Sequence, residues 1–146
     1  FGLGSSYLAT QDLRQKLHRI GMFAFEAPDN HQAITSSALM DKRDVGIVFS
    51  HSGETPESLE VLRVMKNSGA KTVAITNFPN SPIAQIADFK LITVAKETRY
   101  RSGAMSSRIA QLALVDFLFV RIMQLRLESV GSLLERTYKA VRGDRL

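Results

Sequence analysis

Apolar positions along the chain alternate between helical stripes and short continuous runs. Over residues 6–20, Leu13, Leu17 and Ile20 recur at the spacing of one helix face, and Gly21 follows as a suitable helix stop. This pattern predicts a helix that ends before Gly21. Helices are also predicted at later ranges, namely residues 30–40, 56–69, 82–87, 103–127 and 131–141.

Short apolar runs lie between these helices and predict strands. Residues 44–49 contain Val-Gly-Ile-Val-Phe, which is apolar on both faces and typical of a strand covered by helices on both sides. Similar runs predict strands over residues 22–27, 71–76 and 89–94, and Phe1-Gly2 is interpreted as the end of a fifth strand. Strands separated by helices imply crossovers in a parallel sheet. We therefore predict an α/β fold of the doubly wound type, a three-layer α/β/α sandwich with five parallel strands, the first truncated at the N-terminus.

Length and composition agree with one globular domain over residues 1–146. Hydrophobic residues make up 45% and charged residues 23% of the chain, which excludes a wholly disordered protein. The most apolar stretch, residues 112–120, is interrupted by Asp116 and is shorter than the roughly 18 residues of a membrane span, so no membrane contact is expected. The first residues show neither an initiator Met nor a signal-peptide pattern, so we expect the chain to be a fragment.

Cysteine, histidine and charge content narrow the chemistry. The absence of cysteine excludes disulfides and thiolate sites and fits a reducing, cytoplasmic compartment. No two histidines have metal-ligand spacing, so neither a metal nor another cofactor is expected. The 19 Lys and Arg residues exceed the 14 Asp and Glu residues, but the excess is spread along the chain. We therefore expect attraction of small anions rather than direct binding of DNA by this segment.

Small hydroxyl residues and glycine follow two of the predicted strands. Residues 2–6 read Gly-Leu-Gly-Ser-Ser, and residues 50–55 read Ser-His-Ser-Gly-Glu-Thr. In open parallel sheets, ligands bind outside the carboxyl ends of the strands. Each loop also leads into a predicted helix N-terminus, where free N–H groups and the helix dipole favour an anion. The sequence therefore predicts a phosphate cradle built from neutral donors.

Other phosphate-binding loops do not match. A Walker A loop needs a Lys after its glycine, and none follows Gly53. A dinucleotide-binding fingerprint needs a third glycine where Tyr7 stands. A tight strand-to-helix turn is the structural alternative for each loop, but two such loops in one sheet favour a binding role. Thr55 suits a helix N-cap and Pro56 the first helical position.

These motifs are similar to those of a known family. The chain resembles the SIS (sugar isomerase) phosphosugar-binding domain, which has a flavodoxin-like fold. The resemblance lies in two segments, Gly2-x-Gly4-Ser5-Ser6 and Ser50-x-Ser52-Gly53-x-Thr55. The chain also resembles the SIS half of RpiR-type bacterial transcription regulators in further stretches of its own sequence, namely residues 74–77, 81–84, 87–88, 97 and 101–112. The resemblance covers nearly the whole chain. It implies a five-stranded parallel sheet, a phosphorylated-sugar effector bound near a subunit interface, and a DNA-binding helix-turn-helix domain upstream, absent from this segment.

The resemblance also implies site residues. The phosphate contacts correspond to Ser50, Ser52, Gly53 and Thr55. Ser5 and Ser6 would bind the sugar hydroxyls or complete the anion site, with Gly4 beside them.

The roles of several further residues stay open. Glu97 would accept a hydrogen bond from a sugar hydroxyl or from the partner subunit, although a lone acidic residue among basic ones is also typical of a solvated ion pair. Ser107 faces the ligand, solvent or a dimer seam. His31 opens a helix near the expected cleft and is a candidate for a sugar contact. His51 is expected to point away from the anion and to pack, and His18 to lie at the surface.

Two functions follow from these residues. The first is a sensor that binds a sugar phosphate and controls sugar-metabolism genes, with no catalytic residues. The alternative is a phosphosugar isomerase or lyase on the same fold, for which Glu97 assisted by His31 is the candidate acid–base pair. The regulator-like stretches favour the sensor. The helix at 103–127 is apolar nearly all round, which favours burial in a homodimer or tetramer.

Overall fold

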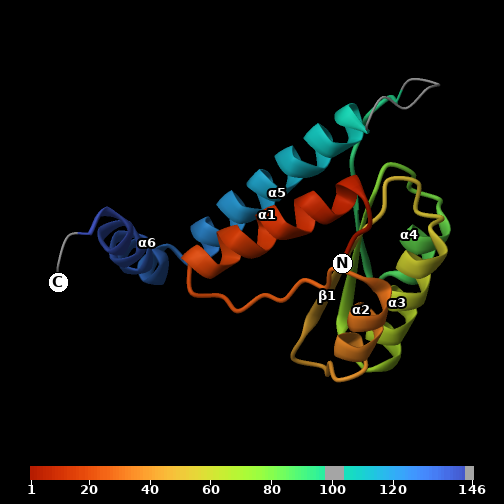
Figure 1. Cartoon of the computed structure of the whole chain (residues 1–146), viewed down its shortest axis with the longest axis horizontal. Coiled ribbons are helices and arrows are strands. Elements are labelled where there is room, and N and C mark those ends of the chain that lie inside the picture. The colour runs from red at the N-terminus through yellow and green to blue at the C-terminus, as the bar shows by residue number, and fades with distance from the viewer. Residues whose placement is uncertain (98–103, 144–146) are drawn as a thin grey trace.

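The computed structural model describes residues 1–97 and 104–143 and contains a parallel sheet flanked by helices (Figure 1). The described strands, in their order across the sheet, are β1 (Val45–Phe49), β2 (Lys71–Thr76) and β3 (Phe89–Ile92). Ile47 lies opposite Val73 and Ile75 lies opposite Leu91 in a continuous parallel register. The strands therefore end at one edge of the sheet, where an α/β fold positions its ligand.

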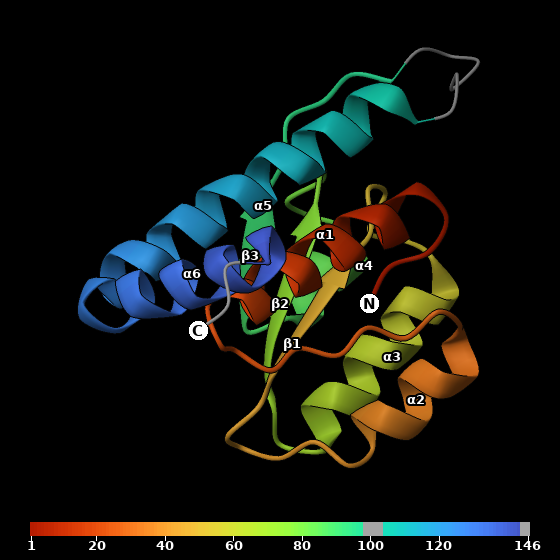
Figure 2. The same ribbon diagram turned by 60° about the vertical axis from the view of Figure 1, so that its left-hand side comes forward.

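Helices cover both faces of the sheet (Figure 2). One layer is formed by α1 (Ser5–Arg19) and α5 (Met105–Leu125), with α6 (Leu127–Arg142) packed against both. The other layer is formed by α2 (Asn30–Ser37), α3 (Pro56–Asn67) and α4 (Pro82–Ile86). The predicted α/β/α layering is confirmed.

Alternate residues of the strands supply the two cores. Val48 and Ala74 are buried on the α2–α3–α4 side, whereas Phe49 and Ile75 are buried on the side of α1 and α5. Successive side chains of a strand point to opposite faces, so one continuous apolar run fills both cores. Burying each large apolar side chain stabilises the fold by about 1.5–3 kcal/mol.

The sheet has three strands in the part of the chain that the structure describes, rather than the five predicted. The segment predicted as the end of a fifth strand forms a single parallel bridge between Gly2 and Phe49, where the Phe49 N–H donates to the Phe1 carbonyl at 2.7 Å. Residues 22–27 form no ladder with any described strand, so the strand predicted there is wrong. Their exposure does alternate, with Phe23 and Phe25 outward. Alternation is typical of a strand, but a strand also needs neighbouring backbone for its hydrogen bonds.

Several predicted boundaries shift by a few residues. The helix expected to reach residue 40 ends at Ser37, and the strand expected to reach residue 94 ends at Ile92. The last helix begins at Leu127 rather than at Gly131, which lies inside α6. The buried Val130 explains this earlier start, because it anchors the first turn of α6 to the core beside α1 and α5.

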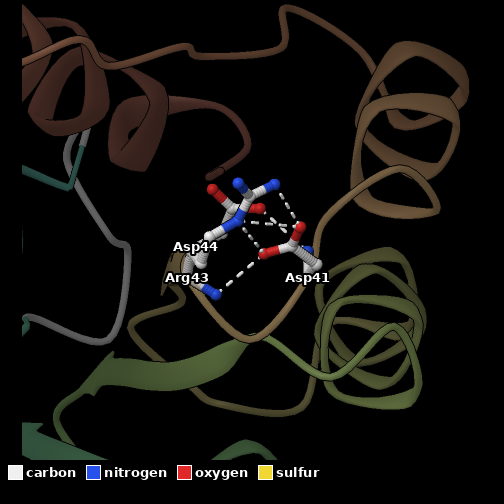
Figure 3. A network of polar contacts seen from close by, with 3 residues as sticks. All are labelled: Asp41, Arg43 and Asp44. Carbon is white, nitrogen blue, oxygen red and sulfur yellow. Dashed lines mark hydrogen bonds and ion pairs between the residues drawn. The ribbon is translucent and has the colours of Figure 1, made fainter.

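Charged side chains fix the turn that precedes β1 (Figure 3). The Asp41 carboxylate accepts hydrogen bonds from the Arg43 backbone N–H at 2.8 Å and from Arg43 Nε at 3.0 Å. The Asp44 carboxylate accepts from the Asp41 N–H at 2.8 Å. The Arg43 side chain and backbone together lower the pKa of Asp41 to about 2.

A second carboxylate joins the starts of β2 and β3. Asp88 accepts hydrogen bonds from the Thr72 N–H at 2.8 Å and the Thr72 hydroxyl at 2.9 Å, and it pairs with Lys66 at 3.2 Å. The Thr72 hydrogen bonds, followed by the Lys66 contact, lower the pKa of Asp88 to about 2. This cluster holds the amino ends of the two strands in register.

Candidate functional site

The two hydroxyl-rich loops meet at the carboxyl edge of the sheet. The bridge between Gly2 and Phe49 places them side by side, because each loop begins directly after one of these residues. Both loops line an open cavity of about 460 Å³. Its lining residues are Leu3, Gly4, Ser5, Ser6, Phe49, Ser50, His51, Ser52, Thr55, Ser58 and Ala104. The loops predicted to form one cradle therefore lie together.

The first loop leaves its backbone open at Gly4. Gly4 has φ 56° and ψ −126°, a conformation that favours glycine. A Cβ at this position would meet no described atom within 4 Å. No side chain of the described residues caps α1, which begins at Ser5. The N–H groups of Ser6 and Tyr7 donate to the Leu3 and Gly4 carbonyls at 3.1 and 3.2 Å, so it is the positive end of the helix dipole that adjoins the cavity.

The second loop is held by its own hydroxyl groups. The buried Ser50 Oγ accepts a hydrogen bond from the Gly53 N–H at 3.1 Å and donates to Thr55 Oγ1 at 3.4 Å. Ser52 Oγ accepts from the Glu54 N–H at 3.3 Å. These bonds shape the second loop, whose residues Ser50, Ser52 and Thr55 line the cavity.

Gly53 packs behind the cavity wall, and its expected phosphate contact stays a prediction. It lies outside the described cavity wall, and its N–H is directed to the Ser50 carbonyl and hydroxyl, each at 3.1 Å. Its φ of 69° favours glycine, and a Cβ would overlap Ser81 Oγ and lie 2.9 Å from Thr76 Oγ1. Gly53 therefore shapes the loop through close packing behind the wall.

The start of α3 adds donors that the sequence analysis missed. Pro56 occupies the first helical position after Thr55, as predicted, but no described side chain caps the helix. Ser58 is 1% exposed and lines the cavity. The spacing of Thr55 and Ser58 was the available signal, because residues three apart lie on one side of a helical turn.

His51 packs against Phe78, but it was also expected to point away from the anion site and is nevertheless a lining residue of the cavity. Its ring contacts Phe78 edge-on with centroids 5.8 Å apart, while the residue also lines the cavity. His18 packs at the surface against Phe23. His31 is exposed on α2 and is not among the described lining residues.

Glu97 lies at the start of α5. Its carboxylate accepts a hydrogen bond from the Ser107 N–H at 2.6 Å, which is a helix-capping geometry. The buried Ser107 hydroxyl donates to the Ala104 carbonyl at 3.2 Å. Ala104 lines the cavity, whereas neither Glu97 nor Ser107 is among its described lining residues.

The ionisable residues of the cavity wall, possible metal ligands and possible membrane-spanning helices also bear on the function. None of the described residues that line the cavity is ionisable except His51, so an anion there would meet hydroxyl and N–H donors. Within residues 1–97 and 104–143, no three His, Asp or Glu side chains gather as a metal site would require. The same residues include no helix whose length and hydropathy suit a membrane crossing. Residues 101–103, the first part of the regulator-like stretch at residues 101–112, lie outside the residues that the structure describes.

Comparison with known proteins supports a specific family. The family model of the SIS domain matches residues 1–121. The HTH-type transcriptional regulator RpiR of Escherichia coli K12 is 35% identical over 137 residues, which cover 94% of this chain and 46% of RpiR. The chain spans about half the length of the curated relatives it matches.

Solved structures share the fold over nearly the whole chain. The Vibrio vulnificus NanR protein complexed with ManNAc-6P superposes with a TM-score of 0.89 at 25% identity, over 99% of this chain and 55% of NanR. A Listeria monocytogenes protein proposed to be a sugar-phosphate isomerase superposes with a TM-score of 0.81 at 25% identity, over 93% of this chain and 72% of that protein.

Proposed function

The chain belongs to the SIS domain family and is related to RpiR-type transcriptional regulators, and on that premise we propose that residues 1–146 form the effector-binding domain of a regulator of sugar-metabolism genes. The proposed effector is a phosphorylated sugar held in the cavity of about 460 Å³. The observation that carries this proposal is the meeting of two hydroxyl-rich loops at two uncapped helix N-termini.

The cavity suits a phosphate dianion through hydrogen bonding. Ser5, Ser50, Ser52 and Thr55 line it, with the Ser50 hydroxyl hydrogen directed to Thr55 Oγ1, and the N-termini of α1 and α3 adjoin it. Hydrogen bonds to a charged group contribute about 1.5–3 kcal/mol each, and a helix dipole adds about 0.3–1 kcal/mol. A few such donors are enough for micromolar binding, and the cavity volume is within the range of small-molecule sites.

Relatives and charge support a sugar phosphate over other anions. The related NanR structure contains ManNAc-6P, a sugar phosphate. The formal net charge of +5 favours anions in general, while the serine- and threonine-rich wall favours a ligand with both a phosphate and hydroxyl groups.

Signalling requires partners beyond this segment. The curated relatives are about twice as long, which supports a DNA-binding domain outside the chain. Ile109 and Phe117 on α5 are 64% and 71% exposed, which supports a homodimer or tetramer. An effector then acts through its difference in affinity for two arrangements of the assembly. A cytoplasmic location stays a prediction.

A phosphosugar isomerase is the second candidate, favoured by the structural similarity to the Listeria monocytogenes protein. The candidate acid–base pair argues against it. Glu97 is bonded to the Ser107 N–H, and His31 is exposed on α2, in the opposite helical layer. Neither is among the described residues that line the cavity.

Calorimetric titration tests the proposal. We expect ManNAc-6P, glucosamine 6-phosphate or fructose 6-phosphate to bind and the unphosphorylated sugars not to bind. Ser52→Ala with Thr55→Ala should weaken binding about 100-fold or more, because two hydrogen bonds to the phosphate are lost. The matched control Thr35→Ala with Ser36→Ala removes two exposed hydroxyls of α2 and should leave binding unchanged.

Two results would contradict the proposal. If the Ser52→Ala/Thr55→Ala variant bound the sugar phosphate as tightly as the wild type, the assignment of these residues to phosphate binding would be wrong. Turnover of any of these sugar phosphates above about 1 s⁻¹ would favour the isomerase.

A further inference from the structure

A buried amide lies directly behind the cavity wall. Gln111 Nε2 of α5 donates a hydrogen bond to Ser6 Oγ of α1 at 3.1 Å. Gln111 is 1% exposed and Ser6 is 8% exposed, and Ser6 lines the cavity while Gln111 does not reach its described wall. The bond therefore joins the first loop to a helix that lies more than 100 residues later in the sequence.

Packing alone does not explain an amide at this position. Gln111 belongs to the buried stripe of α5 and precedes the fully buried Val115 by one helical turn. Its Oε1 is buried and accepts no hydrogen bond from any residue that the structure describes. An amide left partly unsatisfied is unfavourable in apolar surroundings, and methionine has a similar length without that penalty.

The hydrogen-bonding capacity of Ser6 suggests why an amide stands at position 111. A serine hydroxyl has one hydrogen to donate and accepts at its oxygen lone pairs. Gln111 donates to one of those lone pairs, so the hydroxyl hydrogen of Ser6 points elsewhere. Among the described residues, none accepts that hydrogen, and the remaining open side of Ser6 is the cavity.

We propose that Gln111 is a positioning residue that holds the Ser6 hydroxyl as a hydrogen-bond donor toward an oxygen of the bound sugar phosphate. This inference rests on the proposed function. The second loop does not need such support, because Ser50 and Ser52 are oriented by bonds within their own loop. In the first loop the Ser6 backbone N–H donates to the Leu3 carbonyl, but among the described contacts the Ser6 hydroxyl has no bond within the loop, so the group that orients it comes from α5.

A double-mutant cycle tests the role of Gln111. Gln111→Met should weaken binding of ManNAc-6P, glucosamine 6-phosphate or fructose 6-phosphate, whichever binds tightest, about three- to tenfold. Ser6→Ala should cause a similar loss, and Gln111→Met should cause no further loss in the Ser6→Ala background. The melting temperature should change by less than about 5 °C, because an isosteric apolar side chain fills the space. Gln124→Met, on the exposed face of the same helix, is the matched control and should bind like the wild type.

The outcomes separate the two proposals. Unchanged affinity of Gln111→Met, or an equal loss with and without the Ser6 hydroxyl, would overturn the positioning role while leaving the cradle supported by the Ser52→Ala/Thr55→Ala result. A lower melting temperature without any change in affinity would identify Gln111 as a structural link only. Failure of the wild type to bind any of the three sugar phosphates would overturn the proposed function, and this inference with it.

Discussion

Polar side chains lie at both ends of the parallel sheet, but their hydrogen bonds are completed in different ways. At the amino end, the carboxylates of Asp41 and Asp88 each accept several hydrogen bonds and face a cation of the chain itself. At the carboxyl end, the hydroxyls of Ser6 and Ser58 face a cavity, and the adjoining helices have no side-chain cap among the described residues.

This difference separates stability from binding. The amino-end clusters are saturated by the protein and need no ligand, so they hold strands in register. The carboxyl end keeps donors available, which is less favourable for the isolated domain but is required for capture of an anion. Substitutions at the amino end should therefore change stability alone, and substitution of a cavity residue such as Ser58, which does not hold either loop together, should change binding alone.

Gly53→Ala should have the largest effect, because it breaks this separation. We expect a loss of about 3–4 kcal/mol in the free energy of unfolding, from the left-handed backbone and the overlap with Ser81. Gly69→Ala is the matched control, since Gly69 has φ 93° and the nearest described atom to its Cβ is 3.8 Å away. It should lose only about 1–2 kcal/mol. Equal losses in urea denaturation would show that packing against Ser81 is unimportant.

Ser58→Ala should change binding without changing stability. The buried hydroxyl lines the cavity, so we expect affinity for the sugar phosphate to fall about three- to tenfold. The melting temperature should stay within about 2 °C of the wild type. Ser68→Ala, which removes a hydroxyl at the far end of α3, is the control and should leave binding unchanged. Undiminished affinity of Ser58→Ala would restrict the cradle to the two loops.

Asp88→Asn should change the pH dependence of stability and leave binding at neutral pH intact. The folded-state pKa is about 2, below the ordinary value of 3.8. A depressed pKa stabilises the fold above the ordinary value, and the contribution is lost as the pH falls from about 3.8 to about 2. The free energy of unfolding of the variant should therefore depend less on pH between about 3.8 and about 2. Identical profiles in acid titration of the two proteins would contradict the assigned cluster.

Asp41→Asn should have the smallest effect. Its pKa is also lowered to about 2, so the pH window is the same. The Arg43 partner has an 83% exposed side chain, however, and water screens such a pair more than it screens Asp88 and Lys66. A larger flattening for Asp41→Asn than for Asp88→Asn would reverse this order and show that the turn before β1 dominates acid stability.

Local patterns predicted most of the fold. The run at residues 44–49 and the helical stripe at residues 6–20 each depend on side chains a few positions apart, so both were recognisable without knowledge of the rest of the chain. The strand predicted at residues 22–27 failed because pairing depends on a neighbour that the alternation of Phe23 and Phe25 does not reveal.

The candidate site, like the fold, was predictable from the sequence only where it depends on residues close together along the chain. The hydroxyl-rich loops were visible in sequence because each is continuous, and the structure places Ser5, Ser50, Ser52 and Thr55 on one wall. Their direct contacts with a ligand stay predictions. The sequence did not reveal that the Glu97 carboxylate accepts from the Ser107 N–H at the α5 N-terminus, and its expected contact with a ligand or the partner subunit stays a prediction.

The sequence by itself determined the alternation of helices and strands, the parallel character of the sheet and the two glycine- and hydroxyl-rich turns, because these depend on short-range periodicity and backbone preference. Only the tertiary structure decided which groups face the cavity. It brought Gln111 behind Ser6, turned Ser58 inward and packed Gly53 against Ser81. Those contacts join residues distant along the chain, and their geometry depends on how whole helices pack across the sheet.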